Sequence, residues 1–228
     1  GICEAAVRGG HIDCLEYAHK NCFDCDQLSS QCVAIACEEG HIDCLRYAHE
    51  TGSADWGDDG HYSPIDLATE NGHFDCVKYA HEQGCPWSWE TALVAARSGQ
   101  LDCLRYVHKN GFADSAGDGL ECIAAAEGGH VDCLKYCHEV EEWGSWSKFT
   151  MHAAARSGSL GCIVYAHEHG CPWDTQTCAE AARSGSIDCL KYLHENACPW
   201  DSQTCEEAAR NGRIDCLKYA HENGCTWN

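Results

Sequence analysis

Apolar and polar residues follow a helical period along this chain, in short segments that glycine brings to an end. In the segment IDCLKYAHENG, at 214–224, the apolar Ile214 and Leu217 fall near the 3.6-residue spacing of one helix face, while Lys218 faces outwards. An alanine-rich segment, CEEAARNG at 205–212, precedes it. Glycine near a helix end suits a left-handed cap. The pattern therefore predicts two short helices joined by a turn.

This pair of segments recurs eight times, with the copies 27 to 32 residues apart. One cysteine marks each copy: Cys14, Cys44, Cys76, Cys103, Cys133, Cys162, Cys189 and Cys216. Relative to that cysteine, every copy has Ala at −8, Gly at −4, Tyr at +3 and His at +5. A pair this short cannot bury its apolar face alone, so we expect neighbouring pairs to stack.

No stretch of the chain lies outside the repeat, so we expect one domain over 1–228 and no linker. The expected repeats are 1–24, 25–55, 56–85, 86–112, 113–142, 143–171, 172–198 and 199–228.

The repeated unit resembles the ankyrin repeat. Ala-Ala-Arg-Ser-Gly and Gly-His-Ile-Asp-Cys-Leu-Arg-Tyr align with that family's pattern, and the copy at 63–73 is the most similar. Asp58-Asp59-Gly60 looks like the family's finger turn, but most copies are too short for a full hairpin. The Cys-Pro-Trp type is similar to divergent arrays of giant viruses, amoebae, algae and oomycetes. The resemblance implies an all-α solenoid of about eight helix pairs, with the finger hairpins mostly shortened, that binds another protein.

Charge and cysteine content narrow the classes of function. The 36 acidic and 15 basic residues give a net charge of −21, which disfavours binding to nucleic acid or to an anionic membrane. No apolar run approaches the roughly 20 residues of a membrane span. The 21 cysteines are odd in number and no signal peptide is visible, so we expect reduced thiols in an intracellular, cytoplasmic protein.

No enzyme signature stands out from the repeated background. The sequence has no Walker loop and no H-E-x-x-H, and His167-Glu168-His169 is a by-product of the repeated His-Glu. A catalytic site is usually singular, whereas every chemical group here occurs several times. We therefore expect no catalysis and no cofactor.

A metal–thiolate protein is the alternative. Cys189, His194, Cys198 and Cys205 give the spacing C-x4-H-x3-C-x6-C, and such ligands suit tetrahedral zinc. However, residues five apart on a helix are rotated by about 140° from each other, which separates Cys189 from His194. Other copies keep the histidine where the cysteine is replaced, so small buried core positions are the favoured interpretation.

A second metal candidate lies near the start of the chain. A C-x2-C motif lies here close to a histidine and a further cysteine, although C-x2-C alone is not specific for a metal site. The four residues are Cys14, His19, Cys22 and Cys25. For the repeated histidine itself we expect a structural role, next to the last helix carbonyls or packed under a tryptophan such as Trp200. Within the sequence, no ligand partner is seen to recur with it.

Partner-binding residues are expected where the copies differ, because the shared residues are needed for packing. One such position precedes the first glycine and carries the candidates Arg97, Arg156, Arg183 and Arg210. The run Arg156, Arg183 and Arg210 could form a basic stripe in an acidic chain. A solvated helix face of mixed charge is the alternative. The connections carry extra aromatic residues, and exposed aromatics are typical interface anchors. These are Trp89, Trp146 and Phe149, which could instead fill gaps left by changes in loop length.

Overall fold

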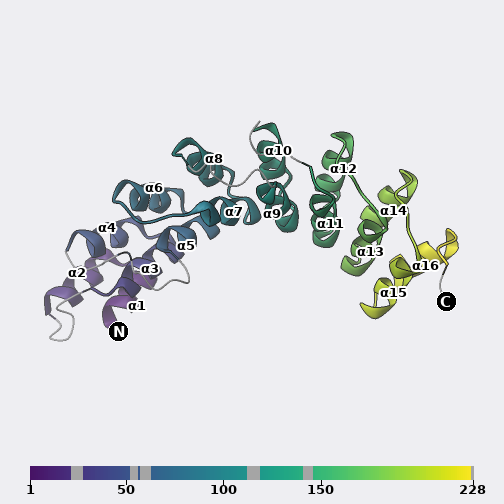
Figure 1. Ribbon diagram of the computed structural model, residues 1–228. Coiled ribbons are helices and arrows are strands. Elements are labelled where there is room, and N and C mark those ends of the chain that lie inside the picture. The colour runs from purple at the N-terminus through teal and green to yellow at the C-terminus, as the bar shows by residue number, and fades with distance from the viewer. Residues whose placement is uncertain (22–27, 52–55, 57–62, 112–118, 141–145, 227–228) are drawn as a thin grey trace. The chain divides into compact units, whose positions relative to one another are not determined.

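The computed structural model describes residues 1–21, 28–51, 56, 63–111, 119–140 and 146–226. Over these residues the chain forms sixteen α-helices and no strand, which confirms the expected all-α class (Figure 1). The expected finger turn at Asp58–Gly60 lies outside the described residues. The helices are α1 Ile2–Arg8, α2 Ile12–Asn21, α3 Ser30–Glu39, α4 Ile42–Glu50, α5 Pro64–Glu70, α6 Phe74–Glu82, α7 Trp89–Arg97, α8 Leu101–Lys109, α9 Leu120–Gly128, α10 Val131–Glu139, α11 Lys148–Ser157, α12 Leu160–Glu168, α13 Thr175–Ser184, α14 Ile187–Glu195, α15 Ser202–Arg210 and α16 Ile214–Glu222.

The chain divides into two compact units, Gly1–Phe112 with α1–α8 and Ala113–Asn228 with α9–α16. Within each unit, an odd-numbered helix pairs with the helix that follows it, and we call these the first and second helices of a pair. First helices pack on first helices, and second helices on second helices. This is the stacking of helix pairs that the repeat predicts.

Side-chain caps and left-handed glycines define the helix ends. The Asp174 carboxylate accepts a hydrogen bond from the Gln176 amide at 3.1 Å, which caps the start of α13. Gly40 ends α3 with a φ of 76°, and a Cβ atom there would lie 2.3 Å from the His73 ring. Glycine is thus required at this position both by the backbone angle and by the close approach of the next pair.

Small residues bring the first helices close together, as the repeated alanine predicts. The alanine that lies four residues before the repeated glycine is buried in all eight copies, from Ala6 to Ala208. The repeated cysteine is also buried in seven of the eight copies, with exposed fractions of 0 to 2%; Cys14 is the exception. Aliphatic side chains such as Leu45 and Leu190 complete the core.

None of the described helices has the length and apolar character that crossing a bilayer requires.

Candidate partner-binding surface

The repeated histidine forms a hydrogen bond with the repeated tyrosine of the next helix pair. Its Nδ1 atom lies 2.9–3.1 Å from that tyrosine's hydroxyl oxygen in six places. The pairs are His19–Tyr47, His49–Tyr79, His81–Tyr106, His138–Tyr165, His167–Tyr192 and His194–Tyr219. This tyrosine is a structural partner of the histidine, and the comparison of copies did not identify it. The signal was present, because both residues are shared by all eight copies, but the partner lies about 25–30 residues away.

A tryptophan stacks on the same histidine, as predicted for Trp200. The ring centroids of His194 and Trp200 are 4.0 Å apart and the rings are 10° from parallel. Equivalent stacks form in four other pairs: His49–Trp56, His81–Trp87, His138–Trp146 and His167–Trp173. The shared histidine, tyrosine and tryptophan are thus occupied in joining one helix pair to the next.

Trp146 was expected to be an exposed aromatic residue outside the repeated tryptophan positions, and the structure places it differently. It is half-buried and its indole lies 4.3 Å from the His138 ring, so it occupies the repeated tryptophan position. The sequence obscured this because Trp146 follows its histidine by eight residues, whereas the other stacked tryptophans follow theirs by six or seven.

The described cysteines are free thiols, and all but Cys14 are buried. Burial raises the pKa of Cys76 to about 12 and that of Cys171 to about 12, so these thiols stay protonated at neutral pH. The thiol that follows the second helix instead donates a hydrogen bond to a backbone carbonyl at the start of its own pair. Cys198 donates to Asp174 at 3.6 Å and Cys225 to Asp201 at 3.1 Å.

The metal candidates do not converge where the structure describes them. Cys189, Cys198 and Cys205 are buried core residues, and His194 is bonded to Tyr219. In the described ranges no three His, Cys, Asp or Glu side chains lie close enough to hold a metal ion. Of the second set, Cys14 is exposed and His19 bonds Tyr47, while Cys22 and Cys25 lie outside the described residues.

The expected basic stripe on α11, α13 and α15 is a ladder of alternating charge. The Arg156 guanidinium donates two hydrogen bonds, of 3.2 and 3.3 Å, to the Glu180 carboxylate of the next pair. Arg210 pairs with Glu207. Arg183 lies between the two carboxylates, 3.9 Å from Glu180 and 4.0 Å from Glu207. We call these five residues the Arg–Glu ladder.

Within the Arg–Glu ladder, Glu180 is buried, Glu207 is partly buried and the guanidinium groups are exposed. The side chain of Glu180 is 6% exposed, whereas those of Arg156 and Arg183 are each 54% exposed. Burial raises the pKa of Glu180, but hydrogen bonds from Arg156 and Gln176 and the nearby positive charges outweigh it and lower the pKa below its usual value. Glu180 and Glu207 could not be recognised from the arginine position alone, because their partners lie on neighbouring helix pairs or one turn away.

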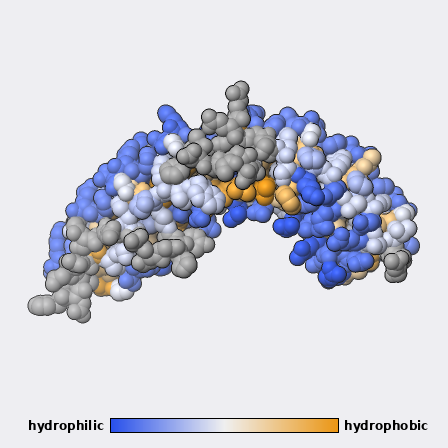
Figure 2. All heavy atoms as spheres, in the orientation of Figure 1, coloured by the Kyte–Doolittle hydropathy of each residue, from blue (hydrophilic) through white to orange (hydrophobic). Residues whose placement is uncertain are grey.

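Exposed apolar side chains lie at the start of α9 and α11, which are first helices of the same unit as the ladder. Leu120 is 38% exposed and Phe149 is 59% exposed, and they occupy equivalent positions in neighbouring pairs. Phe149 packs edge-on against His152, with the ring centroids 5.9 Å apart, and His152 Nε2 lies 2.7 Å from an Asp174 oxygen. Figure 2 shows hydrophobic spheres over α9 and strongly hydrophilic spheres over α13 and α15.

Two predicted residues, Trp89 and Arg97, lie on α7 in the first unit. Trp89 is 44% exposed, at the start of that helix, and Arg97 is exposed at its end. Phe149, Arg156, Arg183 and Arg210 belong to the second unit, where they share the surface of consecutive first helices. The structure thus places four of the seven predicted residues on consecutive first helices of one unit, where Leu120 is a further exposed apolar residue.

Comparison with known proteins agrees with this architecture. The family model for ankyrin repeats in three copies matches residues 2–87. The chain is similar to the crystal structure of the human ASB11 ankyrin repeat domain, with a TM-score of 0.61 and 19% sequence identity, over 75% of this chain and 85% of that one. No curated protein matches the chain. The chain therefore has the ankyrin-repeat fold, and its residues 2–87 match ankyrin repeats in sequence as well.

Proposed function

We propose that the chain is a non-enzymatic scaffold that binds a partner protein on the first helices of its second unit. The observation that supports this most is the exposure of Phe149, a large aromatic side chain of which 59% is open to solvent. A side chain of this kind costs free energy in water and is a typical anchor of a protein interface. The surface, which we call the Phe149 surface, consists of Leu120, Phe149 and the Arg–Glu ladder.

Shared and varied residues have different places in the chain, and this supports the proposal. The shared His, Tyr, Trp and Cys are engaged in packing and hydrogen bonds between pairs, which leaves them few groups for a ligand. The varied residues, such as Leu120 and Phe149, lie on the surface. In repeat proteins the variable surface of stacked helices recognises the partner.

The Arg–Glu ladder gives this surface a fixed pattern of charges, which favours a partner with the complementary pattern. Arg156 and Arg210 already hold carboxylates, so they fix the positions of the charges rather than attract a partner by net charge. Arg183 is farther from both carboxylates than a hydrogen bond allows. Its guanidinium group can therefore donate hydrogen bonds to a carboxylate of the partner. The same partner would contact Phe149 with an apolar side chain.

Photo-crosslinking tests the proposal. A photoreactive amino acid at position 149 should form an adduct with a partner protein in an extract of the source cells. The matched control is position 160, because Leu160 is also an exposed apolar residue at a helix start, but on the second helix α12. The same adducts from both positions, or none from position 149, would contradict the proposal.

A substitution measures the contribution of the anchor once a partner has been captured. Phe149→Asp should weaken binding at least about tenfold, since hot-spot aromatics contribute on the order of 2 kcal/mol or more. Leu160→Asp should leave binding unchanged. Both side chains are exposed, so both variants should keep the thermal stability of the original chain to within about 0.5 kcal/mol.

We also propose a reducing, intracellular location and a partner that is neither nucleic acid nor membrane. The location is supported by the neutral buried thiols, which serve as hydrogen-bond donors and core groups. The net charge of −21 supports the exclusion of polyanionic partners.

A further inference from the structure

Two cysteines of the helix pair α13–α14 lie in contact inside the protein. Cys178 is on α13 and is 0% exposed, and Cys198 is in the connection after α14 and is 3% exposed. A hydrogen bond joins the two thiols, and the Cys178 sulfur also lies 4.0 Å from the carbonyl oxygen of Cys198. We call these two residues the Cys178–Cys198 dithiol. Two thiols in contact are the arrangement from which a disulfide forms.

The same arrangement occurs in the next helix pair. Cys205 on α15 and Cys225 after α16 occupy the equivalent positions, their thiols are hydrogen-bonded, and both pack in one buried cluster. In the copy before the dithiol, the first-helix position holds Met151, while Cys171 keeps the position after the second helix. That copy therefore has one of the two thiols, and the paired thiols are a feature of particular copies.

The dithiol offers two sulfur ligands and no more. Among the residues that the structure describes, no three His, Cys, Asp or Glu side chains lie close enough together to hold a metal ion. Structural zinc requires four such ligands. The donor set therefore suits chemistry that uses two sulfur atoms, and the formation of a disulfide is such a reaction.

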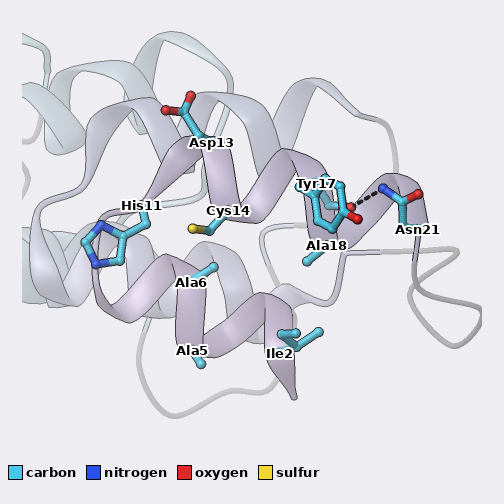
Figure 3. Close-up of a pocket in the computed structure, with 9 residues that line it drawn as sticks. All are labelled: Ile2, Ala5, Ala6, His11, Asp13, Cys14, Tyr17, Ala18 and Asn21. Carbon is cyan, nitrogen blue, oxygen red and sulfur yellow. Dashed lines mark hydrogen bonds between the residues drawn. The ribbon is translucent and has the colours of Figure 1, made fainter.

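Exposure alone does not make a site of this kind. Cys14 is exposed and lines, together with His11 and Tyr17, a largely apolar hollow between α1 and α2 (Figure 3). It is the one cysteine among the described residues that line this hollow, so none of them supplies a second thiol to displace a reagent bound to Cys14.

Cys198 is the thiol of the pair that a reagent reaches first. It lies outside the helices, and its sulfur is held by long hydrogen bonds to backbone carbonyls, 3.6 Å to Asp174 and 3.8 Å to Pro199. Ala197, the residue before it, holds a left-handed φ of 62°, which costs free energy in a residue with a Cβ atom. Opening this connection therefore costs less than unfolding either helix.

We propose that the Cys178–Cys198 dithiol is an oxidation site, which closes to an intrachain disulfide by exchange with a small-molecule disulfide such as glutathione disulfide. The Cys198 thiolate attacks one sulfur of the reagent, which releases one thiol and leaves a mixed disulfide on Cys198. The Cys178 thiolate then attacks the Cys198 sulfur and releases the second thiol. Two cysteine thiols are oxidised, one reagent disulfide is reduced, and the two cysteine protons pass to the released thiolates.

The surroundings of Cys178 determine how fast the site closes. The hydrogen bond with Cys198 and burial both raise the pKa of Cys178. Since the thiolate is the attacking species, the second step is slow at neutral pH and becomes faster as the pH rises. The disulfide closes a loop whose ends are 20 residues apart, which restricts the unfolded chain and stabilises this helix pair. The site is separate from the Phe149 surface, so the two proposals can fail independently.

Mass spectrometry of the 228-residue chain tests the proposal. The folded chain is incubated with about 1 mM each of glutathione and glutathione disulfide, then alkylated and digested. The Cys178–Cys198 linkage should exceed the mixed disulfide on Cys198 by at least about tenfold, because the second thiol is already in place. Cys178→Ala should leave only the mixed disulfide. The matched control Cys189→Ala, which removes another buried cysteine of the same helix pair, should keep the linkage. Absence of the linkage, or the same products from both variants, overturns the proposal.

A comparison of folded and unfolded chains shows whether the fold directs the reaction. Cys122 and Cys137 also have hydrogen-bonded thiols, but both are 0% exposed and both lie within helices, so they should stay reduced in the folded chain. In concentrated urea this difference should vanish. The oxidised chain should also unfold at a higher urea concentration than the reduced chain, and a dithiol reductant should reverse the shift. Equal amounts of both linkages in the folded chain overturn the proposal.

Discussion

At the scale of single residues, the backbone at the end of the second helix favours glycine. Gly84, Gly170 and Gly224 occupy this position with φ angles of 78 to 87°, in the left-handed region. Ala197 holds the same position at a φ of 62°, where its Cβ crowds the backbone. It is the one non-glycine residue with a positive φ among the described residues. This pair therefore stores conformational strain that its neighbours lack.

Ala197→Gly should raise the free energy of unfolding by about 0.5–1 kcal/mol, because relief of left-handed strain exceeds the extra chain entropy of glycine. Urea denaturation measures the change. The reverse substitution, Gly170→Ala, is the control. The added Cβ meets no atom within 4 Å, so this change should destabilise the chain through the backbone conformation alone. A loss of stability in Ala197→Gly would contradict the strain argument.

At the scale of helix pairs, the histidine–tyrosine bond and its tryptophan stack form the recurring joint. The His167 ring lies 4.1 Å from Trp173, and its Nδ1 is 2.9 Å from the Tyr192 hydroxyl. Aromatic stacking fixes the ring plane, and the hydrogen bond fixes its rotation within that plane. The joint therefore sets the register of one pair against the next.

A double-mutant cycle with His167→Ala and Tyr192→Phe should show a coupling energy of about 1 kcal/mol, the usual net value of one hydrogen bond. Chemical denaturation of the four proteins gives this energy. Tyr17→Phe is the reference for the hydroxyl itself, since Tyr17 is 72% exposed, and should change stability by less than about 0.5 kcal/mol. Additive effects of the two changes would show that the bond contributes nothing to stability.

Comparison of copies within one sequence predicts the helices, their glycine ends and their small core residues. Those features depend on local geometry, which each copy repeats. Contacts between copies are harder to predict. Every copy has a histidine equivalent to His167 and a tyrosine equivalent to Tyr192, but each of these residues bonds to a residue of the neighbouring pair and not of its own. The same holds for Glu180 and Trp146. Glu180 bonds to Arg156 and Trp146 stacks on His138 because adjacent pairs pack together, and the residues next to them in the sequence do not indicate these contacts.

At the scale of the whole molecule, the histidines make stability depend on pH. Burial lowers the pKa of His108 to about 3. Burial also lowers the pKa of His138, with a further contribution from the charge of His169. The folded chain therefore binds these protons less readily than the unfolded chain does, and one such histidine lies in each unit.

Stability from these histidines is present above their ordinary pKa of 6.5 and decreases as the pH falls below it. We expect the melting temperature to fall between pH 7 and pH 5 more steeply for the original chain than for His108→Asn, which cannot take up the proton. The loss of net negative charge is common to both proteins, so the difference between them isolates the histidine. Parallel curves would contradict the assignment.

The joints between pairs also determine how a unit responds to force. Each histidine–tyrosine bond connects a helix pair only to its immediate neighbour, so tension between the ends of a unit passes through the joints in series. The weakest joint opens first, and the added chain length lowers the tension on the remaining joints. A unit stretched in this way therefore lengthens in steps, one helix pair at a time, and each step dissipates mechanical work.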